Sequence, residues 1–238
     1  MNGKVSKTQR LTKNVVHSII EGFEPFAITP GQFVMVDVLD GQKRAYGVSN
    51  APTNGKVDKL ELFVDTTPGG PGSRFFDKLK EGKTFSFTGP YGEFMISTEQ
   101  APKLKKIVFL ATGTGIAPIK ALVEALTIGD YKPGLDQMPT RDIRLFFGLR
   151  YAEDLFLQDY FRKLENQSTN LSFVCTLSRP TPAWKGASGY ITEHLLKSSI
   201  ALKEYDYFIC GARDTSEKII DLLKSHEIPQ ERLHFEHY

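Results

Sequence analysis

The pattern of hydrophobic and polar positions changes near residue 106. Before it, short apolar or alternating stretches are separated by Gly and Pro, which predicts a series of short strands. One short helix at 72–79 interrupts them, because Phe75, Phe76 and Leu79 recur at helical spacing. The predicted strands of this half are 15–21, 32–38, 44–49, 59–65 and 84–87.

After residue 106, short apolar runs alternate with longer amphipathic stretches, so strands are expected to alternate with helices. The predicted strands of this half are 107–110, 143–147, 171–176, 207–210 and 233–235, and the predicted helices are 116–126, 155–164, 190–196 and 216–226.

The two patterns predict two domains: an N-terminal antiparallel β-barrel and then an α/β domain with a doubly wound parallel sheet. A length of 238 residues allows one or two domains with cores of their own. We place the domains at 1–100 and 101–238, because the polar run 97–106 separates the two patterns.

The stretch 111–118, ATGTGIAP, joins a predicted strand to a predicted helix. The run 107–110 before it is continuously apolar, as in a strand buried on both faces. Glycines at such a turn let the backbone approach a pyrophosphate, and the N-terminus of the following helix favours negative charge. Pro118 suits the first helical turn, where its missing N–H would have no partner. A tight structural turn is the alternative for this stretch alone.

Two familiar phosphate loops do not match this stretch. A P-loop needs Lys and then Ser or Thr at the helix start, where this chain has Ile116 and Ala117. The usual dinucleotide fingerprint needs a third glycine, where this chain has Pro118, and an acidic residue after the second strand. That strand ends in Gly148, Leu149 and Arg150. The turn therefore belongs to a different dinucleotide family or binds no dinucleotide.

Composition and charge narrow the class. The hydrophobic share of 40% and the charged share of 24% are ordinary for a soluble globular enzyme, and a net charge of +2 does not indicate nucleic-acid binding. Cys175 and Cys210 are far apart and form no CxxC, which argues against an iron–sulfur or zinc site in this chain and for a reducing compartment.

Targeting and metal signals are weak. The N-terminus is basic but has no apolar core like that of a signal peptide, and no stretch approaches the ~18 apolar residues of a membrane span. We therefore expect a cytoplasmic protein without membrane contact. His234 and His237 lie three apart in a predicted strand and face opposite sides, so no metal site is predicted.

Two stretches of the predicted barrel could hold a cofactor. Strand alternation puts Arg44, Tyr46 and Val48 on one face, where a cation and an aromatic ring could hold a phosphate and cover a flat ring. An ordinary strand with a solvated arginine fits equally well. Residues 70–73 offer a helix N-terminus with a hydroxyl, which could bind a phosphate. Taken alone, this stretch is better interpreted as an ordinary helix cap.

Taken together, these motifs resemble the ferredoxin-NADP reductase superfamily, and most closely the bacterial ferredoxin/flavodoxin-NADP reductases. The resemblance covers nearly the whole chain, and so many motifs in the family's order are more specific than any one of them. The matching motifs are GQF at 31–33, RxY at 44–46, GxxS at 70–73, GPYGEF at 89–94, GTGIAP at 113–118, GLR at 148–150, LSRP at 177–180, CG at 210–211 and the final EHY at 236–238.

The resemblance implies FAD on the barrel and NADPH, with NADH possible, on the second domain. It implies that Arg44 contacts the flavin phosphate, that Tyr46 packs on the isoalloxazine, and that Tyr238 stacks on the opposite flavin face. The other residues expected to bind cofactor are Gly47, Val48, Ser49, Gly70, Gly72, Ser73, Gly113, Thr114, Gly115, Ile116, Ala117, Pro118, Gly148, Arg150, Ser178, Arg179, Cys210 and Gly211.

The residues expected at the reacting centre are Tyr238, Cys210, Glu236 and Ser49. The family's chemistry is hydride transfer, which needs nicotinamide and flavin stacked in near-attack geometry. The resemblance places Cys210 and Glu236 near that centre. From its context alone, Cys210 fits an inert buried thiol equally well, and it is expected to pack beside the ring rather than to act as a nucleophile.

One departure from the family pattern lies at Gly47, where the family usually has Ser or Thr near flavin N5. Ser49 could substitute only if the strand is displaced. Alternatively, the Gly47 N–H donates and the missing side chain leaves room at the flavin. The residues do not decide between these.

The coenzyme preference depends on Arg150, Ser178, Arg179 and Lys185. A 2′-phosphate favours a guanidinium fork, which Arg179 could supply, although an arginine before a proline in a turn is commonly solvated. Because no acidic residue ends the second strand, NADPH is favoured over NADH.

The resemblance thus implies an FAD-dependent reductase that takes hydride from NADPH and passes single electrons to a small acidic redox protein, ferredoxin or flavodoxin. We expect a monomer. The alternatives are a reductase component of an oxygenase or a free flavin reductase, and, in another class, a non-catalytic NAD(P)-binding redox sensor or electron-transfer subunit. Two basic groups could meet the acidic partner, although such runs are commonly solvated surface. They are Lys4, Lys7, Arg10 and Lys13, or Lys103, Lys105 and Lys106.

Overall fold

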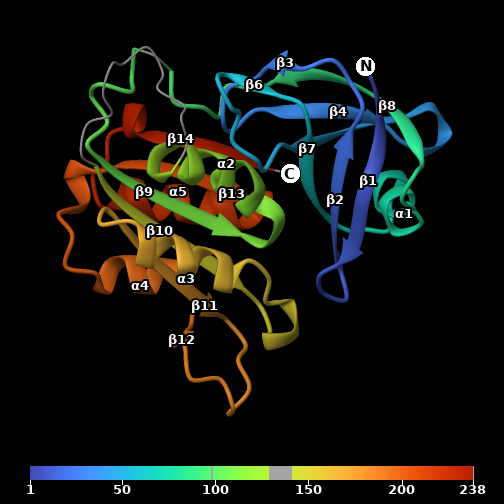
Figure 1. Ribbon diagram of the computed structural model, residues 1–238. Coiled ribbons are helices and arrows are strands. Elements are labelled where there is room, and N and C mark those ends of the chain that lie inside the picture. The colour runs from blue at the N-terminus through green and yellow to red at the C-terminus, as the bar shows by residue number, and fades with distance from the viewer. Residues whose placement is uncertain (98, 129–140, 238) are drawn as a thin grey trace.

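The computed structural model describes residues 1–97, 99–128 and 141–237, and it contains two large sheets, one from each half of the chain (Figure 1). The first sheet is antiparallel with the strand order β5-β4-β8-β1-β2-β7. Its strands are β1 (Asn2–Arg10), β2 (Val15–Glu21), β4 (Phe33–Asp37), β5 (Lys43–Gly47), β7 (Leu60–Asp65) and β8 (Thr84–Tyr91).

Smaller elements complete the first half. Strands β3 (Phe26–Ala27) and β6 (Lys56–Val57) form a separate pair, and helix α1 (Pro71–Asp77) follows β7. The pattern does not predict β1, because Gly3 and Val5 are its only buried residues and the rest of the strand is polar. The buried faces of the strands and α1 enclose one apolar cluster, as expected for the barrel half.

The second sheet is parallel with the order β12-β11-β10-β9-β13-β14. Helices α2 and α3 share an apolar cluster with one face, and α4 and α5 with the other, so the predicted doubly wound α/β fold is confirmed. The elements are β9 (Lys106–Thr112), α2 (Ile116–Thr127), β10 (Asp142–Leu149), α3 (Gln158–Gln167), β11 (Leu171–Leu177), β12 (Ala187–Ser188), α4 (Ile191–Lys197), β13 (Asp206–Gly211), α5 (Arg213–Ser225) and β14 (Leu233–His237).

Element boundaries differ from the predicted ones by a few residues. The third helix begins at Gln158 rather than at 155, because Leu157 adopts a left-handed conformation with φ 59° just before it. The last helix begins at Arg213 rather than at 216. Helix ends carry weaker pattern signals than buried faces, so such shifts are expected there.

The two halves share part of one hydrophobic core. Val15 and Phe63 from the first sheet belong to the same apolar cluster as α2, α3 and the second sheet. The Phe63 ring lies 5.8 Å from the Phe156 ring of the second half. The sheets are therefore packed together rather than merely connected.

No helix within the described part of the chain is long and apolar enough to cross a membrane. The described residues also contain no group of three or more His, Cys, Asp or Glu side chains placed to hold a metal ion.

Candidate functional site

The ATGTGIAP stretch lies where the strand order of the parallel sheet reverses. Strand β9 pairs with β10 on one side and with β13 on the other, and one 3-10 turn, Gly113–Gly115, leads from β9 into α2. Ligands of open α/β sheets bind outside the carboxyl ends of the strands at this switch point. The predicted strand, turn and helix are confirmed, at the place where such a sheet binds a nucleotide.

Glycines let this turn lie directly against the end of β13. A Cβ on Gly115 would be 2.3 Å from the Cys210 carbonyl oxygen, and a Cβ on Gly211 would be 2.0 Å from Thr112 Oγ1. Side chains at either position would push the two strand ends apart. Gly113 has φ +54° and open space around it, and no side chain caps the start of α2. The N–H groups at this helix start therefore fit a phosphate.

The first turn of α2 packs against strand β5 of the other half. A Cβ on Gly47 would lie 2.9 Å from Cδ of Pro118. The position of the missing side chain is thus filled by the Pro118 ring, so it does not add free room for a flavin. Ile116, Ala117 and Pro118 of this first turn are all buried.

Ser49 and Val48 lie inside the protein. The fully buried Ser49 hydroxyl donates to the Glu61 carbonyl oxygen at 2.9 Å. The Val48 side chain is buried, and its N–H donates to the Gln32 carbonyl oxygen at 3.1 Å. The Ser49 hydroxyl proton is therefore already bonded to a backbone carbonyl of the first half.

Three predicted flavin-binding residues come together at α1. A Cβ on Gly72 would lie 2.2 Å from the Tyr46 hydroxyl oxygen and 3.3 Å from Arg44 Cγ. The Tyr46 ring packs edge-on against Phe76 at 4.7 Å between ring centres. Burial raises the pKa of Tyr46 to about 12, so its phenol stays protonated at neutral pH. Gly72 thus allows the strand and the helix to meet closely.

The same corner offers donors for a pyrophosphate. The Arg44 guanidinium is exposed and donates to Gln42 Oε1 at 2.5 Å and to the Lys43 carbonyl at 2.8 Å. Gly70 precedes α1 with open space beside it, and no side chain caps this helix. Ser73 is buried, and its hydroxyl donates to the Asp65 carbonyl at 3.3 Å. A cation beside first-turn N–H groups is the donor set that fits the phosphates of FAD.

Cys210 and Glu236 are paired neighbours on β13 and β14. The Cys210 side chain is buried. Glu236 Oε2 is buried and has no hydrogen-bond partner among the described residues, and burial raises the pKa of this carboxyl to about 7. A Cβ on Gly92 of the first half would lie 3.5 Å from Glu236 Oε1, so both halves meet at this carboxyl. Tyr238 lies outside the described residues.

The residues expected at the coenzyme phosphate gather at the ends of β10 and β11. The Ser178 N–H donates to the Leu149 carbonyl, and the Arg179 N–H donates to the Arg150 carbonyl at 2.8 Å. The Arg179 guanidinium also donates to the Tyr151 hydroxyl at 3.1 Å. Gly148 allows α4 to pack closely, because a Cβ there would lie 2.9 Å from Ile191. Arg150, Arg179 and Lys185 are exposed, as a cationic phosphate site requires.

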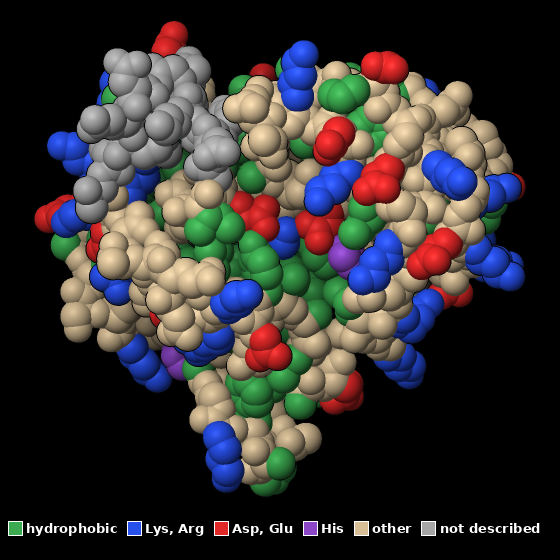
Figure 2. Space-filling view, in the orientation of Figure 1, with side chains coloured by type: hydrophobic (Ala, Val, Ile, Leu, Met, Phe, Trp, Pro, Cys, Tyr) green, Lys and Arg blue, Asp and Glu red, His purple; other side chains and the backbone are tan. Residues whose placement is uncertain are grey.

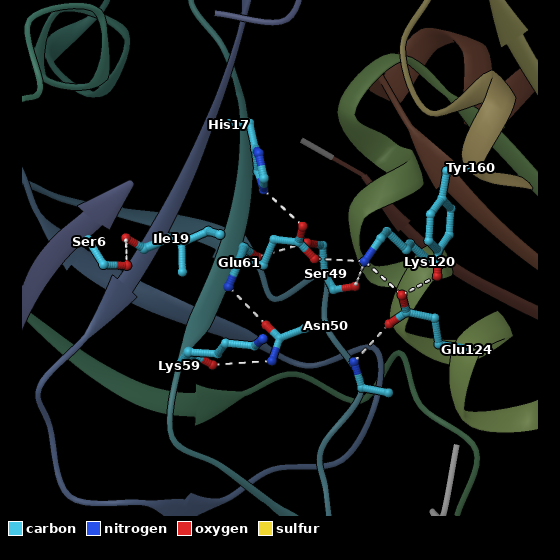
Figure 3. Close-up of polar contacts among 11 residues, drawn as sticks. Ser6, His17, Ile19, Ser49, Asn50, Lys59, Glu61, Lys120, Glu124 and Tyr160 are labelled. Carbon is cyan, nitrogen blue, oxygen red and sulfur yellow. Dashed lines mark hydrogen bonds and ion pairs between the residues drawn. The ribbon is translucent and has the colours of Figure 1, made fainter. Parts of the chain in front are cut away.

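Sequence reasoning missed a polar group between the halves, shown in Figure 3. Lys120 of α2 is 4% exposed and makes ion pairs with Glu61 of β7 and Glu124 of its own helix. Tyr160 of α3 donates to Glu124. The signal in the sequence is a single lysine within the otherwise apolar run IAPIKALV.

Comparison with known proteins gives matches along most of the chain. Residues 3–96 match the oxidoreductase FAD-binding domain family, and residues 109–219 match the oxidoreductase NAD-binding domain family. Ferredoxin--NADP reductase B of Sorangium cellulosum is 30% identical over 224 residues, which are 90% of this chain and 86% of that protein.

Other relatives are longer proteins. The aromatic O-demethylase reductase subunit of Amycolatopsis is 28% identical over 239 residues, 99% of this chain and 67% of the relative. The CDP-6-deoxy-L-threo-D-glycero-4-hexulose-3-dehydrase reductase of Yersinia pestis is 29% identical over 76% of this chain, which spans 51% of that protein.

Solved structures share the fold across the whole chain. The ferredoxin NADP+ reductase of Neisseria gonorrhoeae, solved with bound FAD and NADP, superposes with a TM-score of 0.80 at 23% identity, over 100% of this chain and 98% of that one. An Amycolatopsis cytochrome P450 reductase gives a TM-score of 0.85 at 24% identity, over 100% of this chain and 69% of that one.

Proposed function

The chain belongs to the ferredoxin-NADP reductase superfamily, with FAD-binding and NAD-binding oxidoreductase domains, and on that premise we propose that it takes hydride from NADPH and passes single electrons to ferredoxin or flavodoxin. It is an FAD-dependent oxidoreductase. FAD held there would supply the chemistry of accepting a hydride and releasing electrons one at a time. The protein's part is to position the two cofactors and to control protons and water.

The contact between Gly47 and Pro118 is the observation that carries this proposal. Gly47 ends the strand whose Arg44 and Tyr46 are assigned to the flavin, and Pro118 begins the helix of the phosphate loop. The segments assigned to flavin and nicotinamide therefore touch. Hydride transfer needs the two rings stacked at near-attack distance, and this contact supports such a meeting.

On the first half, we assign Arg44 and the N–H groups that follow Pro71 in the first turn of α1 to the FAD phosphates, and Tyr46 to one face of the flavin ring. The exposed guanidinium beside the uncapped start of α1 supports the first assignment. Tyr238 is assigned to the opposite face on the family resemblance. A stacked aromatic ring excludes water and can yield to nicotinamide at a cost of about 1 kcal/mol.

On the second half, we assign the turn Gly113–Gly115 to the pyrophosphate of the coenzyme, and Arg150 and Arg179 to the 2′-phosphate. Two exposed guanidinium groups linked through neighbouring backbone support NADPH over NADH. The buried Cys210 side chain is assigned to packing beside the nicotinamide ring. Glu236 is assigned to holding a proton at Oε2, because a pKa of about 7 lets the carboxyl take up or release one near neutral pH.

We further propose that the FAD-binding domain spans 1–100 and the NAD(P)-binding domain 101–238. The matched regions 3–96 and 109–219 support this division, because they lie on either side of it. We also propose a cytoplasmic, monomeric protein whose exposed basic residues on β1, including Lys4, Lys7 and Arg10, face an acidic redox partner.

Anaerobic stopped-flow mixing of the purified holoprotein with NADPH or NADH tests the hydride step. Rapid bleaching of the yellow flavin, faster with NADPH, is expected. A colourless protein that binds dinucleotide without turnover would instead support a redox sensor. Steady-state reduction of ferredoxin or flavodoxin tests the proposed electron acceptor. If neither protein is reduced faster than a free dye, the proposed acceptor is wrong.

A reductase component of an oxygenase is the second candidate. It is favoured by the match to the aromatic O-demethylase reductase subunit along 99% of this chain. This reading predicts that NAD(P)H oxidation is coupled to an oxygenase partner and not to ferredoxin or flavodoxin. The two readings share the flavin and the hydride step, so the acceptor assay decides between them.

A further inference from the structure

A polar cluster around the buried Lys120 ammonium of α2 joins the two halves, and its other members are partly buried. We call it the Lys120 cluster; it consists of Lys120, Glu61, Glu124, Tyr160 and His17 (Figure 3). The Lys120 ammonium donates to Glu61 Oε2 at 2.7 Å and to the Ser49 carbonyl oxygen at 3.2 Å, and it lies 2.8 Å from Glu124 Oε1. All three ammonium protons therefore have acceptors.

The cluster is built from both halves. Glu61 lies on β7 and pairs with His17 of β2, with 2.8 Å between Oε1 and Nε2. Glu124 belongs to α2, but it also accepts a hydrogen bond from the Ala51 N–H of the first half at 3.1 Å. The Lys120 ammonium also lies 5.1 Å from the centre of the Tyr160 ring of α3. Each charged member thus contacts groups of the opposite half.

An apolar contact would be the simpler way to join the halves here. Phe63 and Phe156 already make one beside the cluster, and Figure 2 shows apolar side chains next to acidic, basic and histidine ones at the junction. Burial of charges is costly unless each is paired. Hydrophobic attraction is non-directional, whereas the Lys120 ammonium must reach acceptors of both halves at hydrogen-bond distance at the same time. The cluster therefore specifies one orientation of α2.

That orientation concerns the segments assigned to the two cofactors. Lys120 follows Pro118 by two residues on α2, and Ser49 follows Gly47 by two residues after β5. The hydrogen bond from Lys120 to Ser49 and the contact of Pro118 with Gly47 therefore connect the same two stretches of chain. A movement of α2 relative to the first half would therefore act on both contacts.

We propose that the Lys120 cluster fixes the helix of the phosphate loop on the flavin-binding half, which makes Lys120 and Glu61 positioning residues for hydride transfer. This inference rests on the proposed function. In this proposal neither Lys120 nor Glu61 touches a cofactor, and both act through the orientation of α2. Loss of the cluster leaves both binding sites intact and changes the distance and angle between them.

The double variant Glu61→Gln/Lys120→Met tests this inference. It removes one charge of each sign, and Glu124 keeps its bonds from Ala51 and Tyr160. Lys120→Met alone would leave two partly buried carboxylates without their cation, so the double variant is expected to fold more reliably. Tyr160→Phe is a milder third variant. The matched control is Glu227→Gln/Lys203→Met, which removes an exposed ion pair of the same chemistry.

Two measurements are made on the FAD-loaded proteins. Amide hydrogen exchange without nucleotide is expected to quicken in α2 and β7 of the double variant and to stay unchanged in the control. The limiting rate of flavin bleaching by NADPH is expected to fall about tenfold or more, with the half-saturating NADPH concentration within about threefold of the parent, because misplacement affects the reaction more than binding.

An unchanged limiting rate in the double variant overturns the inference, as does a slower rate that is matched by loss of FAD or NADPH affinity. If the double variant does not fold, Tyr160→Phe decides by the same two criteria. A parent protein that neither NADPH nor NADH bleaches refutes the proposed function, whereas unchanged exchange in α2 and β7 refutes the positioning role by itself.

Discussion

Substitution of Gly47 by serine tests how closely the two halves approach. The backbone at Gly47 is open to other residues, because it does not have the positive φ that favours glycine. The cost therefore comes from the new Cβ, which would lie 2.9 Å from Pro118 Cδ. The Pro118 ring cannot rotate away by itself, because it belongs to the backbone of α2, and the Lys120 bonds connect that helix to the first half. Extra atoms in such a packed contact cost about 1–3 kcal/mol.

Thermal unfolding of the holoprotein measures this cost. A protein of this length loses about 2–4 °C in Tm per kcal/mol, so Gly47→Ser is expected to unfold several degrees below the parent. The control is Ala45→Ser, which adds the same hydroxyl to an exposed residue of β5 and is expected to change Tm little.

A double-mutant cycle identifies the contact responsible. Pro118→Ala removes Cδ, so the Gly47→Ser/Pro118→Ala protein is expected to recover at least about 1 kcal/mol relative to the sum of the single changes. Additive effects, or a Gly47→Ser protein as stable as the parent, would show that this contact does not set the approach of the two halves.

Three further outcomes are expected. Arg179→Ala is expected to raise the half-saturating NADPH concentration about tenfold and to leave that of NADH unchanged in steady-state assays; equal effects on both would contradict the 2′-phosphate assignment. Tyr238→Ser is expected to narrow the NADPH to NADH preference about fivefold, and an unchanged ratio would count against stacking. The Glu236 pKa of about 7 lies above its ordinary value of about 4.3, so its contribution to stability is present below pH ~4.3 and is lost as pH rises through 7. Urea unfolding should therefore find Glu236→Gln more stable than the parent by about 2–4 kcal/mol at pH 8, with a smaller difference at pH 4; the lower figure allows for solvent screening of this partly exposed carboxyl.

Patterns within a single element predicted most of the fold. The apolar run 107–110 predicted a fully buried central strand, and all four of these residues are inaccessible to solvent in the structure. The glycine turn after it was predicted with its neighbours, because glycine, strand and helix signals lie side by side in the chain. Strand β1 was missed because its partners, β2 and β8, hold it through backbone bonds that leave no mark on its polar sequence.

Contacts between distant segments limited the prediction of the site. Gly47 was identified as a departure from the family, but only the fold shows that Pro118 occupies the space beside it. Lys120 and Glu61 are 59 residues apart, so no local pattern connects them. A lysine in an apolar helix stretch indicates a buried partner, yet it does not say which carboxylate that partner is.

The apolar cluster shared by the two halves has a consequence for protein engineering. Val15 and Phe63 are buried with residues of the second half. If the two halves were expressed separately, with the division near residue 100, each would expose an apolar patch that promotes aggregation. A chimaera that joins this nucleotide half to a foreign barrel would need both aromatic packing and a carboxylate facing Lys120. Exchange of coenzyme specificity between such reductases is therefore better attempted by changing side chains at the ends of β10 and β11 than by swapping whole modules.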